Sequence, residues 1–144
     1  MPDILHDFPI SAPVSRVFEA VSTPGGLDRW WTLTSAGEPR QGQVFQLGFG
    51  PEFDWRARVS RCEADRCFEL EITQASPDWV GTRVSFDLQP AENGGTQVRF
   101  AHRGWPAESG HYRTSSFCWA MYLRLLGRSL ELGEVVPYDD RLRA

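Results

Sequence analysis

Residues 96–105, TQVRFAHRGW, and residues 113–132, RTSSFCWAMYLRLLGRSLEL, decide the fold of this chain. The first stretch alternates in the way of a half-buried β-strand, and the second has the length and apolar spacing of a helix. Apolar residues cover most of the circumference of this helix, which indicates burial on more than one side. A long helix laid across the concave face of a bent antiparallel sheet explains both patterns, and any volume that it leaves unfilled becomes a cavity.

The strand places His102 on the same face as Phe100, which is the inner face. The ordinary interpretation is a buried histidine whose ring nitrogens are satisfied by a hydroxyl or a backbone group. The alternative is ligand contact or proton transfer, which makes His102 the candidate catalytic residue. Tyr122, or His111 and Tyr112 at the mouth of the pocket, would then assist it.

The composition fits one globular domain over residues 1–144, with 41% hydrophobic and 24% charged residues. A net charge of −4 argues against a nucleic-acid partner. All 15 basic residues are arginine, so Schiff-base chemistry, a lysine general base and a Walker-type phosphate loop are excluded. The N-terminus lacks a signal-peptide pattern and the longest apolar run, 117–123, is too short to span a bilayer, so we expect a cytoplasmic protein without membrane contact.

Three cysteines cannot form a complete disulfide framework. Cys62 and Cys67 could face each other across a hairpin, although free thiols are expected in a reducing compartment. We expect Cys118 to lie in the core. No cysteine spacing resembles a zinc site, and His102 with His111 is a poor ligand set, so no metal and no cofactor is predicted.

Helix and turn signals divide the rest of the chain. A first strand is expected over 4–10, and a helix then begins near Pro13 with Ser11 as its candidate N-cap. Residues 23–26 break this helix, and a second short helical turn is expected over 27–31. Alternating apolar residues predict further strands over 43–49, 53–61, 67–73 and 84–88.

Hydrophobic parity also fixes the expected register of two hairpins. A four-residue turn over 63–66 gives three pairs: Cys62 with Cys67, Val59 with Leu70, and Arg58 with Glu71. A loop with an odd number of residues, 91–95, and with Gly94 or Gly95 in the left-handed conformation, gives two more pairs: Val84 with His102, and Asp87 with Arg99.

Several short strings occur in a familiar order: ISAP (10–13), VFEAV (17–21), LDRWW (27–31), GQVF (42–45), GTQVRF (95–100), HRGW (102–105) and residues 119–126. Over essentially its whole length the chain resembles the START-like (SRPBCC) superfamily, and within it the branch of activator of heat-shock-protein ATPase homologue-like proteins. The resemblance implies an α+β helix-grip (START/birch-pollen-allergen-like) fold. In that fold a curved antiparallel sheet of six or seven strands wraps around a long C-terminal helix, with two short helices after the first strand.

The resemblance also implies a small-molecule-binding domain whose internal cavity takes a hydrophobic, lipid-like or aromatic partner. The residues expected to line this cavity are Trp31, Phe45, Leu47, Trp55, Leu70, Phe86, His102, Trp119 and Tyr122. Whether the protein is an enzyme stays open, since a polyketide cyclase- or aromatase-like enzyme using His102 is one alternative. The other is a stress- or chaperone-associated interaction module, or a homodimer, using exposed Trp79, Trp105 or the corner at 48–51.

Overall fold

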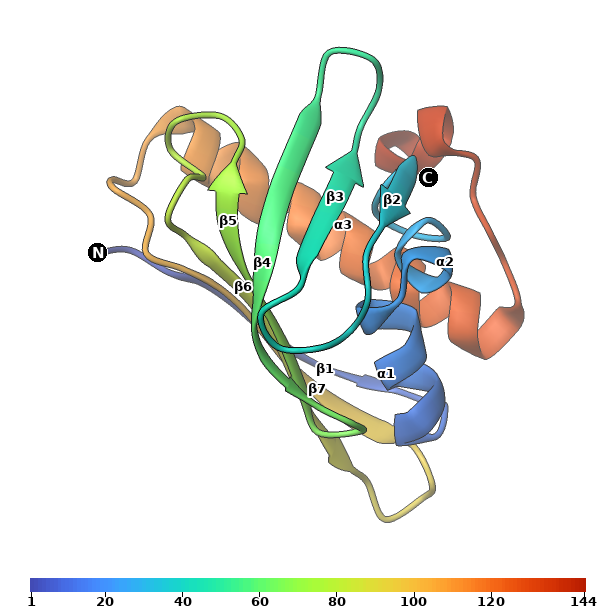
Figure 1. The fold of residues 1–144 in the computed structure, drawn as a ribbon. Coiled ribbons are helices and arrows are strands. Elements are labelled where there is room, and N and C mark those ends of the chain that lie inside the picture. Colours follow the sequence, from blue (N-terminus) through green and yellow to red (C-terminus); the bar gives the residue numbers. More distant parts are fainter.

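Seven antiparallel strands form one curved sheet. They are β1 (Ile4–Ile10), β2 (Thr34–Ala36), β3 (Val44–Gly48), β4 (Asp54–Glu63), β5 (Cys67–Gln74), β6 (Arg83–Pro90) and β7 (Thr96–Arg103). The computed structural model describes residues 1–144, and the strand order in the sheet is β1-β7-β6-β5-β4-β3-β2. The long helix α3 (Gly110–Leu132) crosses the concave side, so the predicted α+β helix-grip fold is confirmed with seven strands (Figure 1). None of the helices combines the length and apolar character that crossing a bilayer requires.

Two short helices follow β1, as predicted, but the second is displaced toward the N-terminus. Helix α1 spans Val14–Ser22 and helix α2 spans Pro24–Leu27. The predicted end of the first helix is confirmed at Thr23, but the break is one residue long and does not extend over 23–26. The second helix begins at Pro24 where the prediction had Leu27, and only hydrogen-bonded turns continue over 28–31. Proline suits the first helical turn, and the Thr23 Oγ1 accepts a hydrogen bond from the Gly26 N–H at 3.0 Å, which starts the new helix at once.

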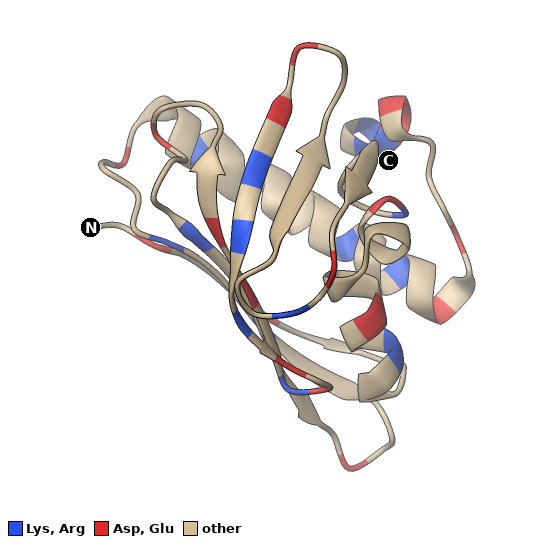
Figure 2. Ribbon diagram, viewed as in Figure 1, with Lys and Arg blue, Asp and Glu red and all other residues tan.

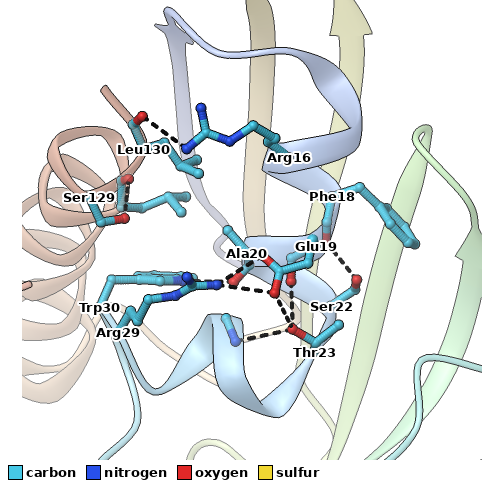
Figure 3. A network of polar contacts seen from close by, with 12 residues as sticks. Arg16, Phe18, Glu19, Ala20, Ser22, Thr23, Arg29, Trp30, Ser129 and Leu130 are labelled. Atoms are coloured by element: carbon cyan, nitrogen blue, oxygen red, sulfur yellow. Dashed lines mark hydrogen bonds and ion pairs between the residues drawn. The ribbon is translucent and has the colours of Figure 1, made fainter. Parts of the chain in front are cut away.

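The start of α1 is tied to the far end of α3. Ser11 does not cap α1, because Pro13 occupies the N-cap position and offers no side-chain hydrogen bond. Instead, the Ser11 backbone N–H donates to the Glu131 carboxylate at 2.7 Å. The Arg16 guanidinium donates to the Leu130 carbonyl at 3.4 Å (Figure 3). Residues that are distant in sequence therefore hold α1 against α3.

Helices α1 and α2 pack with their backbones in close contact. A Cβ atom at Gly26 would lie 2.5 Å from the Glu19 carbonyl oxygen and 2.7 Å from the Ala20 Cα, so only glycine fits there. Figure 3 shows the Trp30 indole N–H donating to the Ala20 carbonyl, at 3.0 Å, and Arg29 paired with Glu19, at 2.9 Å. This packing fixes Trp30 inside the core.

The β4–β5 hairpin has the predicted register at one end only. Two predicted pairs, Val59 with Leu70 and Arg58 with Glu71, are confirmed. The pairing of Cys62 with Cys67 is wrong, because an irregularity between Val59 and Arg61 shifts the register by one residue. Cys62 faces Phe68, Glu63 faces Cys67, and the turn contains three residues, with Asp65 at a φ of 63°. Both thiols are free.

The β6–β7 hairpin follows the prediction in full. Val84 lies opposite His102 and Asp87 lies opposite Arg99, across a loop over 91–95. Gly94 has a φ of 84°, which is the left-handed conformation that the odd loop requires. The register brings His102 to the inner face of the sheet, under α3.

The inner face of the sheet is apolar and fully packed at its centre. Its buried side chains include Phe45, Leu47, Val59, Phe68, Leu70, Ile72, Val84, Phe86, Val98 and Phe100. Trp79 and Trp105 are buried as well, with 6% and 0% of their surface exposed. The prediction that these two tryptophans are exposed for a protein partner is therefore wrong.

The outer face of the sheet is charged. Figure 2 shows basic and acidic residues interspersed over β4 and the neighbouring strands. The Arg58 guanidinium contacts the Glu71 carboxylate at 3.0 Å, and Arg61 lies 3.4 Å from both Glu69 and Asp87. Such cross-strand pairs agree with the predicted register and contribute little stability individually at the surface.

Candidate functional site

A cavity of about 350 Å³ lies between α3, the tip of the β3–β4 hairpin and the C-terminal segment of the chain. Most of its thirteen lining residues are hydrophobic. Eight are aromatic: Trp31, Phe49, Phe53, Trp55, Trp79, Trp119, Tyr122 and Tyr138. Phe53 and Leu142 are about half exposed, so they form part of an open rim.

The aromatic rings contact one another around the wall. The Trp31 ring lies 5.4 Å from Phe49 and 5.0 Å from Trp119, measured between ring centroids. Phe49 contacts Trp55 at 5.3 Å, and Trp55 contacts Trp79 at 4.8 Å. These edge-on and tilted contacts hold the rings in fixed orientations, so the wall is formed before any ligand enters.

One face of α3 supplies six lining residues at helical spacing: His111, Thr114, Ser115, Cys118, Trp119 and Tyr122. The twelve residues from His111 to Tyr122 are separated by eleven helical rises, which correspond to a length of roughly 16 Å along the helix. The cavity is therefore elongated along α3. Cys118, expected in the core, is half-buried in this wall, and burial raises the pKa of its thiol.

The predicted cavity residues divide into two groups. Trp31, Trp55, Trp119 and Tyr122 line the cavity. The others do not reach it, and they are Phe45, Leu47, Leu70, Phe86 and His102. Helix α1 packs against β5 and β6, Trp30 packs edge-on against Phe86 at 6.0 Å, and Trp119 of α3 covers His102. This packing moves the empty volume toward the β3–β4 hairpin.

His102 is buried with both ring nitrogens occupied. The Trp119 indole N–H donates to Nδ1 at 3.1 Å, so Nε2 carries the ring hydrogen and lies 2.8 Å from the Thr82 hydroxyl. The hydroxyl donates in turn to the Trp79 carbonyl at 2.5 Å. Burial lowers the pKa of His102 to about 3. The ring is neutral and links β7 to α3, which is the ordinary interpretation of this residue.

His111 is the histidine that reaches the cavity. Its Nδ1 lies 2.6 Å from the Asp78 carboxylate, and the Ser76 hydroxyl donates to the other oxygen of that carboxylate at 3.0 Å. The imidazole stacks on Trp79 at 6.3 Å and meets the edge of Trp105 at 5.7 Å. These contacts connect the start of α3 with the loop between β5 and β6, and they fix the orientation of the ring.

The C-terminal 3₁₀ helix η1 (Tyr138–Arg143) closes one side of the cavity with Tyr138 and Leu142. Arg141 anchors it, because this buried guanidinium donates to the backbone carbonyls of Thr32 at 3.0 Å, Asp28 at 2.6 Å and Val136 at 3.0 Å. Figure 1 shows the segment returning beside α2 and β2. Burial lowers the pKa of Arg141.

No group of three or more His, Cys, Asp or Glu side chains is arranged to hold a metal ion. Burial raises the pKa of Tyr122 to about 12, so its phenol stays neutral in the cavity wall. No arginine, aspartate or glutamate lines the cavity. The wall therefore suits an uncharged, apolar guest, with polar atoms available at a few points.

A protein-family model described as "Activator of Hsp90 ATPase homolog 1-like protein" matches residues 11–131. The Aha1 dimer from Colwellia psychrerythraea is 28% identical over 93% of this chain and 99% of that chain, with a TM-score of 0.84. SSP2350 from Staphylococcus saprophyticus is 20% identical over 94% and 96% of the two chains, with a TM-score of 0.77. CalU16 from Micromonospora echinospora is 23% identical over 96% and 83%, with a TM-score of 0.75. Among curated proteins there is no significant match.

Proposed function

The chain belongs to the family of activator of Hsp90 ATPase homologue 1-like proteins, and we propose that its function is to bind a small molecule with an aromatic or lipid-like body. The observation that carries the proposal is the cavity of about 350 Å³ with its eight aromatic side chains. Its volume falls in the range of small-molecule sites, which are concave, mostly apolar and largely formed in advance.

Binding is favoured by the burial of apolar surface from both partners. Each square ångström of apolar surface removed from water contributes about 25 cal/mol, before the cost of association is subtracted. The rings of Trp31, Trp55 and Trp119 are held by their neighbours, so little conformational entropy is lost when a guest packs against them.

The enzymatic alternative has no support from the predicted residue. His102 would have to break a hydrogen bond to Trp119 or Thr82 before it could exchange a proton with a substrate. It also lies outside the cavity wall. A catalytic role for this histidine is therefore not part of the proposal.

The proposal is tested by native mass spectrometry of the gently purified protein, followed by titration with a panel of fatty acids, flavonoids and polyketide-like aromatics. Four of the six tryptophans line the cavity, so a bound guest should change the intrinsic fluorescence. A clean apo mass together with no response to the panel would overturn the proposal.

A pair of variants on neighbouring residues of α3 locates the site. Cys118→Trp places a large ring in the cavity wall, and Phe117→Trp replaces a side chain that is 68% exposed. Cys118→Trp should weaken binding at least about tenfold, while Phe117→Trp should leave it within about twofold, since one decade corresponds to about 1.4 kcal/mol. Equal effects of the two variants would place any binding elsewhere.

We also propose a second copy of this chain as its protein partner. The support is the Colwellia psychrerythraea protein, whose structure is that of a dimer. Sedimentation-velocity ultracentrifugation at several concentrations tests the pairing. A chain that stays monomeric at every concentration up to about 100 μM would overturn the proposal. Its dissociation constant would then lie above that concentration, which is too weak for a stable dimer.

A further inference from the structure

Three polar side chains of the cavity wall lie together at one end. His111, Thr114 and Ser115 lie within about one turn of each other near the start of α3. The opposite end is formed by Tyr122, Tyr138 and Leu142. A guest that fills the cavity therefore meets an imidazole and two aliphatic hydroxyls at one end, and two tyrosine rings and a leucine at the other.

His111 presents a single free nitrogen at the polar end. A carboxylate can only accept a hydrogen bond, so the 2.6 Å contact with Asp78 requires the hydrogen of His111 to be on Nδ1. In the neutral ring Nε2 is then an acceptor without a partner. The Ser76 hydroxyl fixes the Asp78 carboxylate, and Trp79 stacks on the imidazole, so this acceptor is held in place.

The Trp79 ring lines the same end, but its indole N–H is covered by neighbouring atoms and is not offered to the cavity. The side chain is 94% buried, and this N–H has no hydrogen-bond partner. A hydroxyl group on the guest both donates and accepts, so it complements the acceptor on His111 and the hydroxyls of Thr114 and Ser115.

The charges at this end disfavour an ionised guest. The Asp78 carboxylate lies beside His111 and would repel a carboxylate or phosphate group. The cavity wall holds no arginine to balance an anion and no carboxylate to balance a cation. His111 and Thr114 are exposed, so this end is open to water, and a neutral hydroxyl there avoids the repulsion from the Asp78 carboxylate.

We propose that the cavity selects an uncharged aromatic compound carrying a hydroxyl group, whose O–H donates to Nε2 of His111 while its rings pack against Trp55, Trp79 and Trp119. This inference rests on the proposed function and adds the chemical class of the ligand. The Asp78 carboxylate acts as a positioning group, because it sets the tautomer of His111 and thereby makes Nε2 the acceptor.

Isothermal titration calorimetry on the full chain at pH 7.5 tests the inference with three probes: 2-naphthol, 2-methoxynaphthalene and 2-naphthoate. The naphthol should bind about five- to tenfold more tightly than its methyl ether, which corresponds to one net hydrogen bond. The naphthoate should bind more weakly than either, because of its charge.

The variant His111→Phe keeps an aromatic ring at the polar end and removes the acceptor. It should bind both neutral probes within about twofold of each other, with the ether affinity little changed. His6→Phe is the matched control, since His6 lies on β1 against Phe100 and is absent from the cavity wall. It should keep the full preference for the naphthol.

The outcomes separate this inference from the proposed function. Equal binding of naphthol and ether to the unaltered chain, or a preference that survives in His111→Phe, overturns the hydroxyl selectivity and leaves aromatic binding intact. If the naphthoate binds more tightly than both neutral probes, the inference that the cavity selects an uncharged guest is overturned. If none of the three probes binds and the fluorescence panel is also silent, the proposed function itself fails.

Discussion

Acidification should destabilise this protein through His102. The folded chain holds the pKa of this histidine at about 3, mainly because of its burial, whereas an unfolded histidine has a pKa of about 6.5. Between these values the unfolded chain binds a proton that the folded chain does not. The stability is therefore fully present above about pH 6.5 and declines as the pH falls toward 3.

The size of this effect follows from the difference between the two pKa values. One pH unit within the interval costs about 1.4 kcal/mol, so lowering the pH from 7.5 to 4.5 removes about 2.5–3 kcal/mol through His102 alone. The stability of a domain of this size totals only about 5–15 kcal/mol. The attraction of Asp78 and Asp3 for a protonated ring opposes the shift, and His111 adds to it, but burial outweighs these charges.

The measurement is urea denaturation at pH 7.5 and 4.5, for the unaltered chain and for His102→Asn. The asparagine amide oxygen replaces the Nδ1 acceptor of the Trp119 indole but does not titrate. The variant should be less stable at pH 7.5, because it loses ring packing and the contact with Thr82. Its loss on acidification should be smaller by about 2.5–3 kcal/mol, since the carboxylates contribute equally to both proteins. Equal losses in the two proteins would refute the reasoning.

Other substitutions test packing and anchoring. Gly26→Ala should lower the free energy of unfolding, measured by urea denaturation, by more than about 2 kcal/mol, because the new Cβ would overlap the backbone of Ala20. Gly25→Ala is the control: a Cβ there has nothing within 4 Å and should change the same free energy by less than about 1 kcal/mol. Arg141→Met removes three hydrogen bonds to backbone carbonyls, so amide exchange over 137–144, followed by mass spectrometry, should accelerate by about tenfold or more while β7 stays protected. Asp65→Gly should stabilise the chain by about 0.5 kcal/mol in thermal denaturation, because Asp65 has a φ of 63°; a lower melting temperature would contradict this.

The fold was predictable because its main signals are periodic. The alternation in residues 96–103 fixed the inner face of β7, and parity with Val84 fixed the β6–β7 register and the odd loop. The extra residue near Ser60 was not predictable, because a bulge alters the pairing without disturbing the alternation on either side of it. The three-residue strand β2 is too short to show any period.

The candidate site was predictable only in part. Period-2 parity shows that Phe45 and Trp55 point inward, but it cannot show that Phe45 packs against Phe68 inside the core while Trp55 lies beside a void. The helical spacing of Cys118 and Ser115 with Trp119 was the available signal for the α3 wall. The contribution of η1 carried no such signal, since Tyr138 reaches the cavity only after the chain turns back across the fold.

The hydrogen bond from Trp119 to His102 has a consequence for protein engineering. It joins α3 to β7 in the interior and fixes the rotation of the helix about its own axis. The cavity-facing positions Thr114, Cys118 and Tyr122 lie on the same helix but take no part in that bond. Their side chains can therefore be exchanged to reshape the binding volume while the helix keeps its setting, which makes this chain a candidate scaffold for receptors directed at new aromatic compounds.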